Sequence, residues 1–369
     1  MPEYKKYEEM IGGTPMINLN SMLSDEAQAR GVVLLGKAEF LNPGFSQKVN
    51  ARRHSMLISS AQPAALSFFR FRAVRSPPAR PQDRIAREIL DQAAASGALQ
   101  PGGTVIAASS GNTGAATAMM GAMRGYKVII VTNSKCSQEK MDSITAYGAE
   151  LIVVEDGVDY MDFANEYAAE HGIYDIDQYD NLANSAAHEK TLAPELLADT
   201  DGTITHFVAG GSTGGTLSGV GRGIKAVKPD VQIVLADPVG SVFAPMFETG
   251  ELVEQGKFLV EGVGKGNIPG NMDFTVVDSS IVITDDESFS TCHLLAQSEG
   301  ILVGGSAGLN VCAAKKVAED APDGSVVVTL LCDNGVKYLS KVYNDEYLTD
   351  NSLSAVADLS VLATQSAKL

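Results

Sequence analysis

The sequence predicts an α/β protein with doubly wound sheets, and three observations lead to this class. Short runs rich in β-branched residues alternate with longer segments that carry Ala, Met and Leu at helical spacing. This alternation is typical of a mostly parallel sheet covered by helices on both faces. Glycine-rich turns follow several of the short runs, and ligands of open parallel sheets bind at such turns.

The expected elements follow in chain order. Strands are expected at residues 32–40, 104–109, 127–132, 150–155, 204–211, 231–237 and 325–333. Helices are expected at residues 113–124, 138–147, 159–171 and 308–318, and another helical pattern follows residue 216. After about residue 345 the chain turns to polar and small residues, so 346–369 is expected to form a C-terminal tail or an edge helix.

Length and composition limit the classes of protein. With 369 residues and 38.8 kDa, the chain is long enough for one large domain or for two lobes that share a site. It has 45% hydrophobic residues but no apolar run near the roughly 18 residues of a membrane helix, so no membrane span is expected. The net charge of -17 would repel a phosphate backbone. Nucleic acid is therefore not an expected partner.

Cysteines, histidines and the N-terminus give further expectations. The four cysteines are far apart and form no C-x-x-C pair, which favours a reduced, intracellular chain. The first residues lack the apolar core of a signal peptide, so the cytoplasm is the expected compartment. His188 and Glu189 begin like a zinc-binding H-E-x-x-H motif, but Leu192 stands at the place of the second histidine. No metal site is expected.

Residues 49–82 differ from the rest of the chain. They hold six Arg, four Pro, three Phe and no Asp or Glu. One interpretation is a basic surface loop. The other is a segment foreign to the fold: every valine codon begins with GT and a glutamine codon can be CAG, so the segment from Val49 to Gln82 has the ends of an unspliced intron. Retention of an intron in frame is thus a hypothesis for this atypical basic insertion.

A glycine-rich turn at residues 210–216 predicts an anion site. The strand that ends there runs into Ser212, Thr213, Gly214, Gly215 and Thr216 and then into a helical pattern. Such a turn aims backbone N–H groups at an anion, and the helix N-terminus adds favourable potential. The spacing matches neither the P-loop nor the G-x-G-x-x-G motif. A small phosphorylated ligand fits better, although a turn without a ligand is the alternative.

Two more turns of this kind open helices. Residues 109–114, with the sequence S-S-G-N-T-G, offer N–H groups and hydroxyls for a carboxylate. Residues 303–308, with the sequence V-G-G-S-A-G, contain Ser306. Plain helix capping is the alternative for both.

Together with residues 42–48, N-P-G-F-S-Q-K, these turns resemble the fold-type II pyridoxal-phosphate enzymes, in the cysteine synthase and cystathionine β-synthase branch. The family pattern N-P-G-x-S-x-K-D-R is met up to Lys48, is interrupted by residues 49–82, and resumes at Asp83 and Arg84. The resemblance extends from about residue 8 to 343. Its other matches are Gly12 to Pro15, residues 146–150, Gln178, Asn181, Asn184 and His188.

The resemblance implies a role for each motif. Lys48 would bind pyridoxal 5′-phosphate as a Schiff base and then remove the substrate α-proton. Ser306 would contact the pyridine nitrogen, and its neutral hydroxyl suits β-elimination better than transamination. Asn112 would bond the ring 3′-oxygen, and the cofactor phosphate would be held by Ser212, Thr213, Gly214, Gly215 and Thr216. The substrate carboxylate would be held by Ser109, Ser110, Gly111, Thr113 and Gln178.

The resemblance also implies architecture and activity. A smaller lobe of about residues 39–150 and a larger lobe of residues 1–38 and 151–345 would form the catalytic region, with the cofactor between them. The expected reaction is that of a cysteine synthase, from O-acetylserine and sulfide to cysteine and acetate, in a homodimer. Residues 261–264 and 304–308 look more like cystathionine β-synthases, which use serine and homocysteine. A catalytically impaired homologue, with Lys48 displaced by the insertion, is the other alternative.

Overall fold

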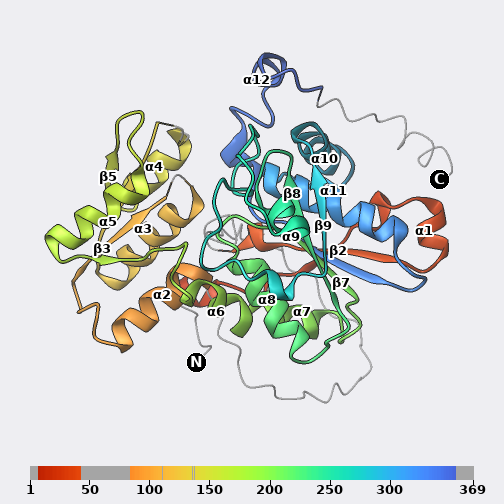
Figure 1. Cartoon of the computed structure of the whole chain (residues 1–369), viewed down its shortest axis with the longest axis horizontal. Helices are drawn as coiled ribbons and strands as arrows, with labels where there is room; N and C mark the ends of the chain where they lie inside the picture. Colours follow the sequence, from red (N-terminus) through yellow and green to blue (C-terminus); the bar gives the residue numbers. More distant parts are fainter. Residues whose placement is uncertain (1–6, 43–83, 110, 135, 137, 355–369) are drawn as a thin grey trace, which may run out of the picture.

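The computed structural model describes residues 7–42, 84–109, 111–134, 136 and 138–354. These residues form two lobes, each built on its own sheet (Figure 1). Helices cover both sheets, and every neighbouring pair of strands is parallel except one at an edge. The predicted α/β class, with two mostly parallel sheets in two lobes, is confirmed.

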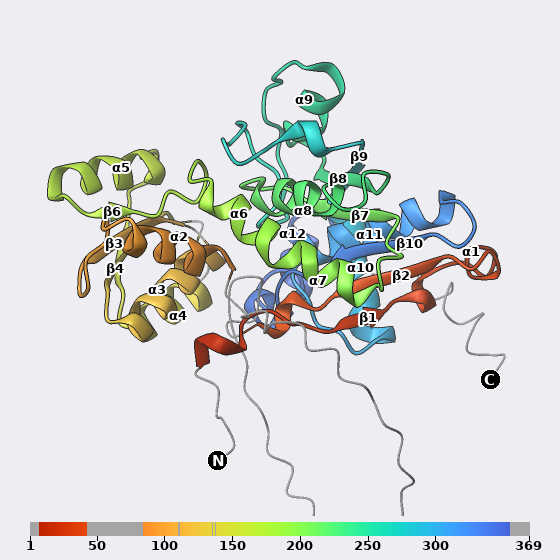
Figure 2. The same cartoon turned by 90° about the horizontal axis from the view of Figure 1, so that it is seen from below.

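The larger lobe contains a sheet with the strand order β1-β2-β10-β7-β8-β9 (Figure 2). β1 pairs antiparallel with β2, with Met16 opposite Lys37, and the remaining pairs are parallel. The strands are β1 (Met16–Asn18), β2 (Val33–Lys37), β10 (Val326–Leu330), β7 (His206–Gly210), β8 (Gln232–Pro238) and β9 (Ser279–Ile283).

The smaller lobe contains a parallel sheet with the order β5-β4-β3-β6. Its strands are β5 (Glu150–Val153), β4 (Lys127–Thr132), β3 (Thr104–Ala108) and β6 (Tyr174–Asp175). The boundary expected near residue 150 therefore falls inside this sheet. The reason is that β5 and β6 come after residue 149 in the chain but form their backbone hydrogen bonds with β4 and β3 of the smaller lobe.

The helices surround these sheets. They are α1 (Asp25–Ala29), α2 (Arg84–Ala95), α3 (Asn112–Arg124), α4 (Gln138–Ala146), α5 (Tyr160–His171), α6 (Ala183–Lys190), α7 (Leu192–Asp199), α8 (Gly215–Lys225), α9 (Phe243–Thr249), α10 (Asp285–Ser298), α11 (Gly305–Asp320) and α12 (Asp345–Asp350). Short 3-10 turns are η1 (Tyr7–Met10), η2 (Asn20–Met22), η3 (Glu39–Leu41), η4 (Phe274–Val276) and η5 (Gly335–Tyr338).

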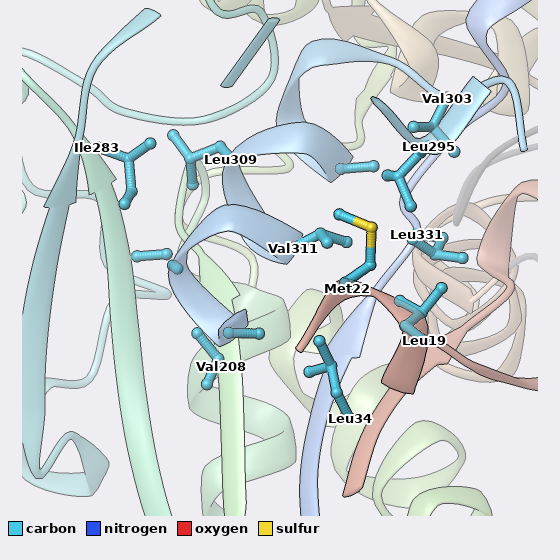
Figure 3. Packing of buried hydrophobic residues seen from close by; sticks show 14 of the residues in the cluster. Leu19, Met22, Leu34, Val208, Ile283, Leu295, Val303, Leu309, Val311 and Leu331 are labelled. Carbon is cyan, nitrogen blue, oxygen red and sulfur yellow. The ribbon is translucent and has the colours of Figure 1, made fainter. Parts of the chain in front are cut away.

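Each lobe has its own apolar core. In the larger lobe, Leu309 and Val311 of α11 pack with Val208, Leu34 and other fully buried side chains of the sheet (Figure 3). In the smaller lobe, α2 and α3 bury Ile89 and Met120 against β3 and β4. Burial of a side chain of this size stabilises the fold by roughly 1.5 to 3 kcal/mol.

All seven strands and all four helices expected from the sequence by residue range are present, with ends shifted by a few residues. Three further strands, β1, β6 and β9, were not expected from the sequence. β1 and β6 span only three and two residues, so neither shows a periodic pattern. The C-terminal stretch begins with α12, and residues 355–369 lie outside the described part. Within the described part, no helix is long and apolar enough to cross a membrane.

Candidate active site

A cavity lies where the smaller lobe meets the turn after β7. It is lined by Asn112 at the start of α3, by residues 210–214 and Thr216 around the start of α8, and by Ser306 at the start of α11. The structure thus brings together six of the predicted cofactor residues: Asn112, Ser212, Thr213, Gly214, Thr216 and Ser306. Gly215 lies among them as the first residue of α8.

Residues 212–216, here called the anion cup, lead into the N-terminus of α8. Gly214 has a φ of 79°, and a Cβ there would lie 2.5 Å from the Cα of Met272, so only glycine fits. None of the described residues that line this cavity carries a charge. Backbone N–H groups and the helix dipole therefore supply the positive potential. This environment fits the phosphate of pyridoxal phosphate.

Asn184 of α6 supports the anion cup from behind. Its Nδ2 donates to Thr213 Oγ1 (2.9 Å) and to the carbonyl of Gln178 (2.7 Å), and its side chain is fully buried. A Cβ on Gly215 would lie 2.1 Å from Asn184 Oδ1, so the cup and α6 are in direct contact. The sequence matched Asn184 to the family pattern without a role. The structure shows that it joins the cup to the Gln178 segment.

The turn after β3 holds the residues predicted to bind a carboxylate. Ser109 Oγ accepts the N–H groups of Gly111 (3.2 Å) and Gly114 (2.9 Å). Thr113 Oγ1 donates to Gln178 Oε1 (2.6 Å), and Gln178 Nε2 donates to the carbonyl of Ala108 (2.8 Å). These bonds fix the orientation of Gln178 beside the turn, as a carboxylate site requires. Ser110, predicted for the same site, lies outside the described residues.

Asn112 links the two lobes. Its Nδ2 donates to Asp333 Oδ2 (2.6 Å), and Lys337 Nζ donates to its Oδ1 (2.9 Å). Tyr338 also donates its hydroxyl proton to Asp333 Oδ2 (2.6 Å), and burial together with this carboxylate raises the pKa of Tyr338 well above its ordinary value. Sequence reasoning missed Asp333. Its signal in the sequence is an acidic residue three positions beyond the apolar run of β10, which ends at Leu330.

A larger cavity, of about 640 Å3, adjoins the first and is called the cleft cavity. Ser109, Gly111, Thr113 and Gln178 all line it, so the structure places the described part of the predicted carboxylate site on one cavity wall.

At the mouth of the cleft, Glu261 pairs with two lysines. Lys140 of α4 donates to its Oε2, and Lys341 Nζ lies 2.5 Å from its Oε1. Burial would raise the pKa of Glu261, but these two ammonium groups hold it below its ordinary value. Lys140 Nζ also lies 4.7 Å from the centroid of the Tyr338 ring. Because Lys140 belongs to the smaller lobe, this cluster joins the lobes at the cleft.

Lys48, the predicted catalytic lysine, lies outside the described residues, as does the insertion at 49–82. The residues on either side of this stretch are held by one carboxylate. Glu39 Oε2 accepts from Asn42 Nδ2 (3.1 Å) and from Arg84 Nε (3.0 Å). The chain thus leaves the described fold at Asn42 and returns to it at Arg84, in contact with the same buried side chain.

The described residues contain no group of three or more His, Cys, Asp or Glu side chains placed to hold a metal ion. All four cysteines are described, and each has a free thiol.

Comparison with known proteins gives consistent matches. The family described as "Pyridoxal-phosphate dependent enzyme" matches residues 82–333. Cysteine synthase 1 of Neurospora crassa is 35% identical over 93% of this chain and 84% of its own length. Cysteine synthase of Staphylococcus aureus is 35% identical over 90% of this chain and 94% of its own length.

Two further matches are named for other activities. Cystathionine beta-synthase of Apis mellifera is 34% identical over 92% of this chain but only 61% of its own length. Among solved structures, O-ureido-L-serine synthase is similar, with a TM-score of 0.77, 30% identity and coverage of 95% of this chain and 100% of its own.

Proposed function

Because this chain belongs to the family of pyridoxal-phosphate-dependent enzymes, we propose that it replaces the β-substituent of an activated L-serine, as a cysteine synthase does. The proposed substrates are O-acetyl-L-serine and sulfide, and the products are L-cysteine and acetate. One observation carries this proposal: a neutral anion cup, the turn after β3 and the hydroxyl of Ser306 face connected cavities. That set suits a phosphate, a carboxylate and an uncharged ring nitrogen.

The anion cup and Ser306 are the proposed holders of the cofactor. Bound pyridoxal phosphate supplies an electron sink for the substrate Cα. The N-terminus of α8 would hold its phosphate, and Asn112 would bond the oxygen on its ring. Ser306 would meet the ring nitrogen with a hydroxyl, which does not favour a protonated ring as a carboxylate would. The site would therefore favour loss of a β-substituent.

The turn after β3 is the proposed carboxylate site. Gln178 is fixed by Thr113 and by the carbonyl of Ala108, so it is already oriented before a substrate arrives. The N–H groups at the start of α3 add favourable potential for an anion. Lys48 would accept the proton from the substrate Cα, which its expected place in the family pattern supports.

Visible absorption tests the proposal directly. The purified chain, incubated with pyridoxal phosphate and freed of excess, is expected to show a visible band that Lys48→Ala loses. Addition of O-acetyl-L-serine should change that band, and sulfide should then yield cysteine and acetate in equal amounts. A band that O-acetyl-L-serine leaves unchanged would contradict the proposed donor, and no band at all would favour an impaired homologue.

We also propose that residues 49–82 are an insertion into an otherwise continuous catalytic region. Two observations support this. The family match begins at residue 82, where the segment ends, and Glu39 binds both Asn42 and Arg84. Without the segment, Lys48, Asp83 and Arg84 restore the family pattern. Only six residues, 43–48, then separate Asn42 from Asp83.

A deletion variant and transcript sequencing test the insertion. Deletion of residues 49–82 is expected to leave the far-ultraviolet circular dichroism of the fold in place and to retain or increase cofactor binding. A deletion variant that fails to fold would show that the segment is part of the structure. The intron hypothesis requires that mature transcripts lack these 34 codons. If every mature transcript contains the 34 codons, the hypothesis is wrong.

A homodimer in the cytoplasm is the proposed biological form. The family resemblance supports the dimer, and light scattering on the 38.8 kDa chain should give twice that mass. The four free thiols support a reducing compartment, which fractionation of cells that produce the protein can check.

A further inference from the structure

Lys265 lines the cleft cavity and takes no part in the chemistry proposed above. Its backbone is fixed, because its N–H donates to Ser241 Oγ (3.2 Å) and its carbonyl accepts the N–H of Val242 (3.0 Å). The preceding residue, Gly264, donates its N–H to the carbonyl of Gly211, next to the anion cup (2.7 Å). Lys265 is therefore carried by a segment tied to the proposed cofactor site.

The ammonium group of Lys265 has an aromatic partner, and the one carboxylate that acts on its charge, Asp159, does so from beyond ion-pair distance. Its Nζ lies 4.0 Å from the centroid of the Tyr179 ring, which is the geometry of a cation–π contact. Across residues 7–42 and 84–354, where described, no carboxylate lies within ion-pair distance of it. Burial lowers the pKa of Lys265, which agrees with a side chain withdrawn from water. An ammonium in such a place gains free energy when a ligand supplies an anion.

The charged side chains that line the cleft cavity do not balance that positive charge. The charged residues among its described lining are Lys140, Lys265, Lys341 and Glu261. Glu261 is shared by Lys140 and Lys341, as described above, so it does not neutralise Lys265. In a chain whose net charge is -17, this is a locally positive cavity that attracts anions.

The size of the cavity bears on the second substrate. A volume of about 640 Å3 lies in the range of pockets that hold whole small molecules, whereas sulfide has one heavy atom. Tyr179 follows Gln178 directly, so Lys265 stands close to the proposed carboxylate site without belonging to the turn after β3.

We propose that Lys265, backed by the ring of Tyr179, binds a carboxylate carried by an attacking thiol, so that thiol carboxylic acids serve as nucleophiles in addition to sulfide. This inference rests on the proposed β-replacement. In that reaction the thiol sulfur forms a bond to Cβ of O-acetyl-L-serine, the Cβ–O bond breaks, acetate leaves with the bonding electrons, and the thiol proton is released to solvent.

Paired thiols of equal length test the proposal in steady-state kinetics. With O-acetyl-L-serine as donor, kcat/KM for 3-mercaptopropionate is expected to exceed that for 3-mercapto-1-propanol by about tenfold, the effect of roughly one charge-assisted hydrogen bond. Lys265→Met should bring the ratio close to one, and Lys265→Arg should restore most of it. Lys257→Met, an exposed lysine outside the cavity lining, is the matched control and should keep the ratio of the unmodified chain.

Calorimetry gives a readout that does not depend on turnover. The cofactor-loaded protein is titrated with 3-(methylthio)propionate and with 3-(methylthio)-1-propanol, neither of which can act as a thiol nucleophile. The acid should bind about tenfold more tightly, and Lys265→Met should abolish the difference. A preference that Lys265→Met retains, or no preference in the unmodified chain, overturns the inference. Absence of turnover with sulfide would instead refute the proposed function, while calorimetry still decides the role of Lys265.

Discussion

Two ion-pair clusters join the lobes, and they differ in their exposure to water. At the base, Arg84 of α2 pairs with Glu39 and Glu195 of the larger lobe, and the side chains of Arg84 and Glu39 are both 0% exposed. At the mouth of the cleft, Lys140, whose side chain is 4% exposed, pairs with Glu261, which is 26% exposed. Ion pairs at the two ends of the lobe boundary are therefore expected to contribute different amounts to the free energy of unfolding.

The base cluster is a permanent joint. Burial would raise the pKa of Glu39, but Arg84 holds it below its ordinary value, so this carboxylate is ionised and depends on its partner. Separating the lobes here would leave a charge without a partner. At the mouth, water reaches Glu261 and its second partner Lys341, whose side chains are 26% and 28% exposed. The comparison teaches that the lobes are held together by fully buried charges at the base and by partly exposed charges at the cleft.

The largest effect is expected from breaking the base cluster. Arg84→Met leaves Glu39 buried without its principal cation, so the free energy of unfolding should fall by about 3 to 5 kcal/mol. Urea unfolding followed by circular dichroism measures it. Arg222→Met removes a half-exposed arginine that pairs with Glu189 and Asp273, and should cost less than about 1 kcal/mol. Equal losses in the two variants would refute the distinction by burial.

Asp237 is a buried carboxylate that forms no ion pair within the described fold, in contrast to Glu39, which pairs with Arg84. It is 0% exposed, it accepts the N–H of Ala244 (2.8 Å), and burial raises its pKa to about 6 from 3.8. Since the folded pKa is the higher one, the stabilising contribution of its protonated form is present at low pH and is lost as the pH rises through about 6. Glu39 has the opposite sign, because its lowered pKa stabilises the fold above about 4.5.

Asp237→Asn removes this pH dependence. Relative to the unmodified chain, its free energy of unfolding should rise by about 2 to 3 kcal/mol between roughly pH 4 and pH 7, at about 1.4 kcal/mol for each pKa unit. Urea unfolding of both proteins at the two pH values measures the difference. A constant difference would show that Asp237 titrates in the fold as it does in the unfolded chain.

The mouth cluster should respond more weakly and should depend on salt. Lys140→Met removes one cation from Glu261 and the contact with the Tyr338 ring, so about 1 kcal/mol of unfolding free energy is expected to be lost. The loss should shrink in about 1 M NaCl, because salt screens the partly exposed charge of Glu261. Lys140→Arg should recover most of it. A loss as large as that of Arg84→Met would contradict the weaker coupling expected of this partly exposed pair.

The smallest effect is expected at an exposed ion pair between α6 and α2. Lys190 of α6 pairs with Glu88 of α2, and the lysine side chain is 58% exposed. Lys190→Met should change the free energy of unfolding by no more than about 0.5 kcal/mol. The same urea titrations check this value. The matched control is Lys225→Met, which breaks a partly exposed pair with Asp278.

Much of the fold was predictable from local sequence. Runs such as residues 127–132 are buried along all but their first residue, so apolar content alone marks them as strands. The two-residue β6 was not predictable, because a strand of that length is defined only by its hydrogen bonds to β3. The lobe boundary near residue 150 was misplaced for the same reason, since β5 and β6 reach their sheet through partners elsewhere in the chain.

The candidate site divides in a similar way. The anion cup was predictable, since a glycine with φ of 79° between a strand and a helix leaves a local pattern of Gly and Thr residues. Asp333 was not, because its bond to Asn112 joins residues 221 positions apart. Lys265 was also missed. Nothing near it in the sequence indicates that Tyr179 lies under its ammonium group.

The sequence by itself determined the turns, the helix starts and the family pattern, because these depend on backbone freedom and capping within a few residues. Only the tertiary structure decided which charges are buried, which carboxylate serves two lysines and which lysine lies over a tyrosine ring. Burial and pairing are properties of neighbours in space. The strength of an ion pair follows from its surroundings, and those are assembled only when the two lobes meet.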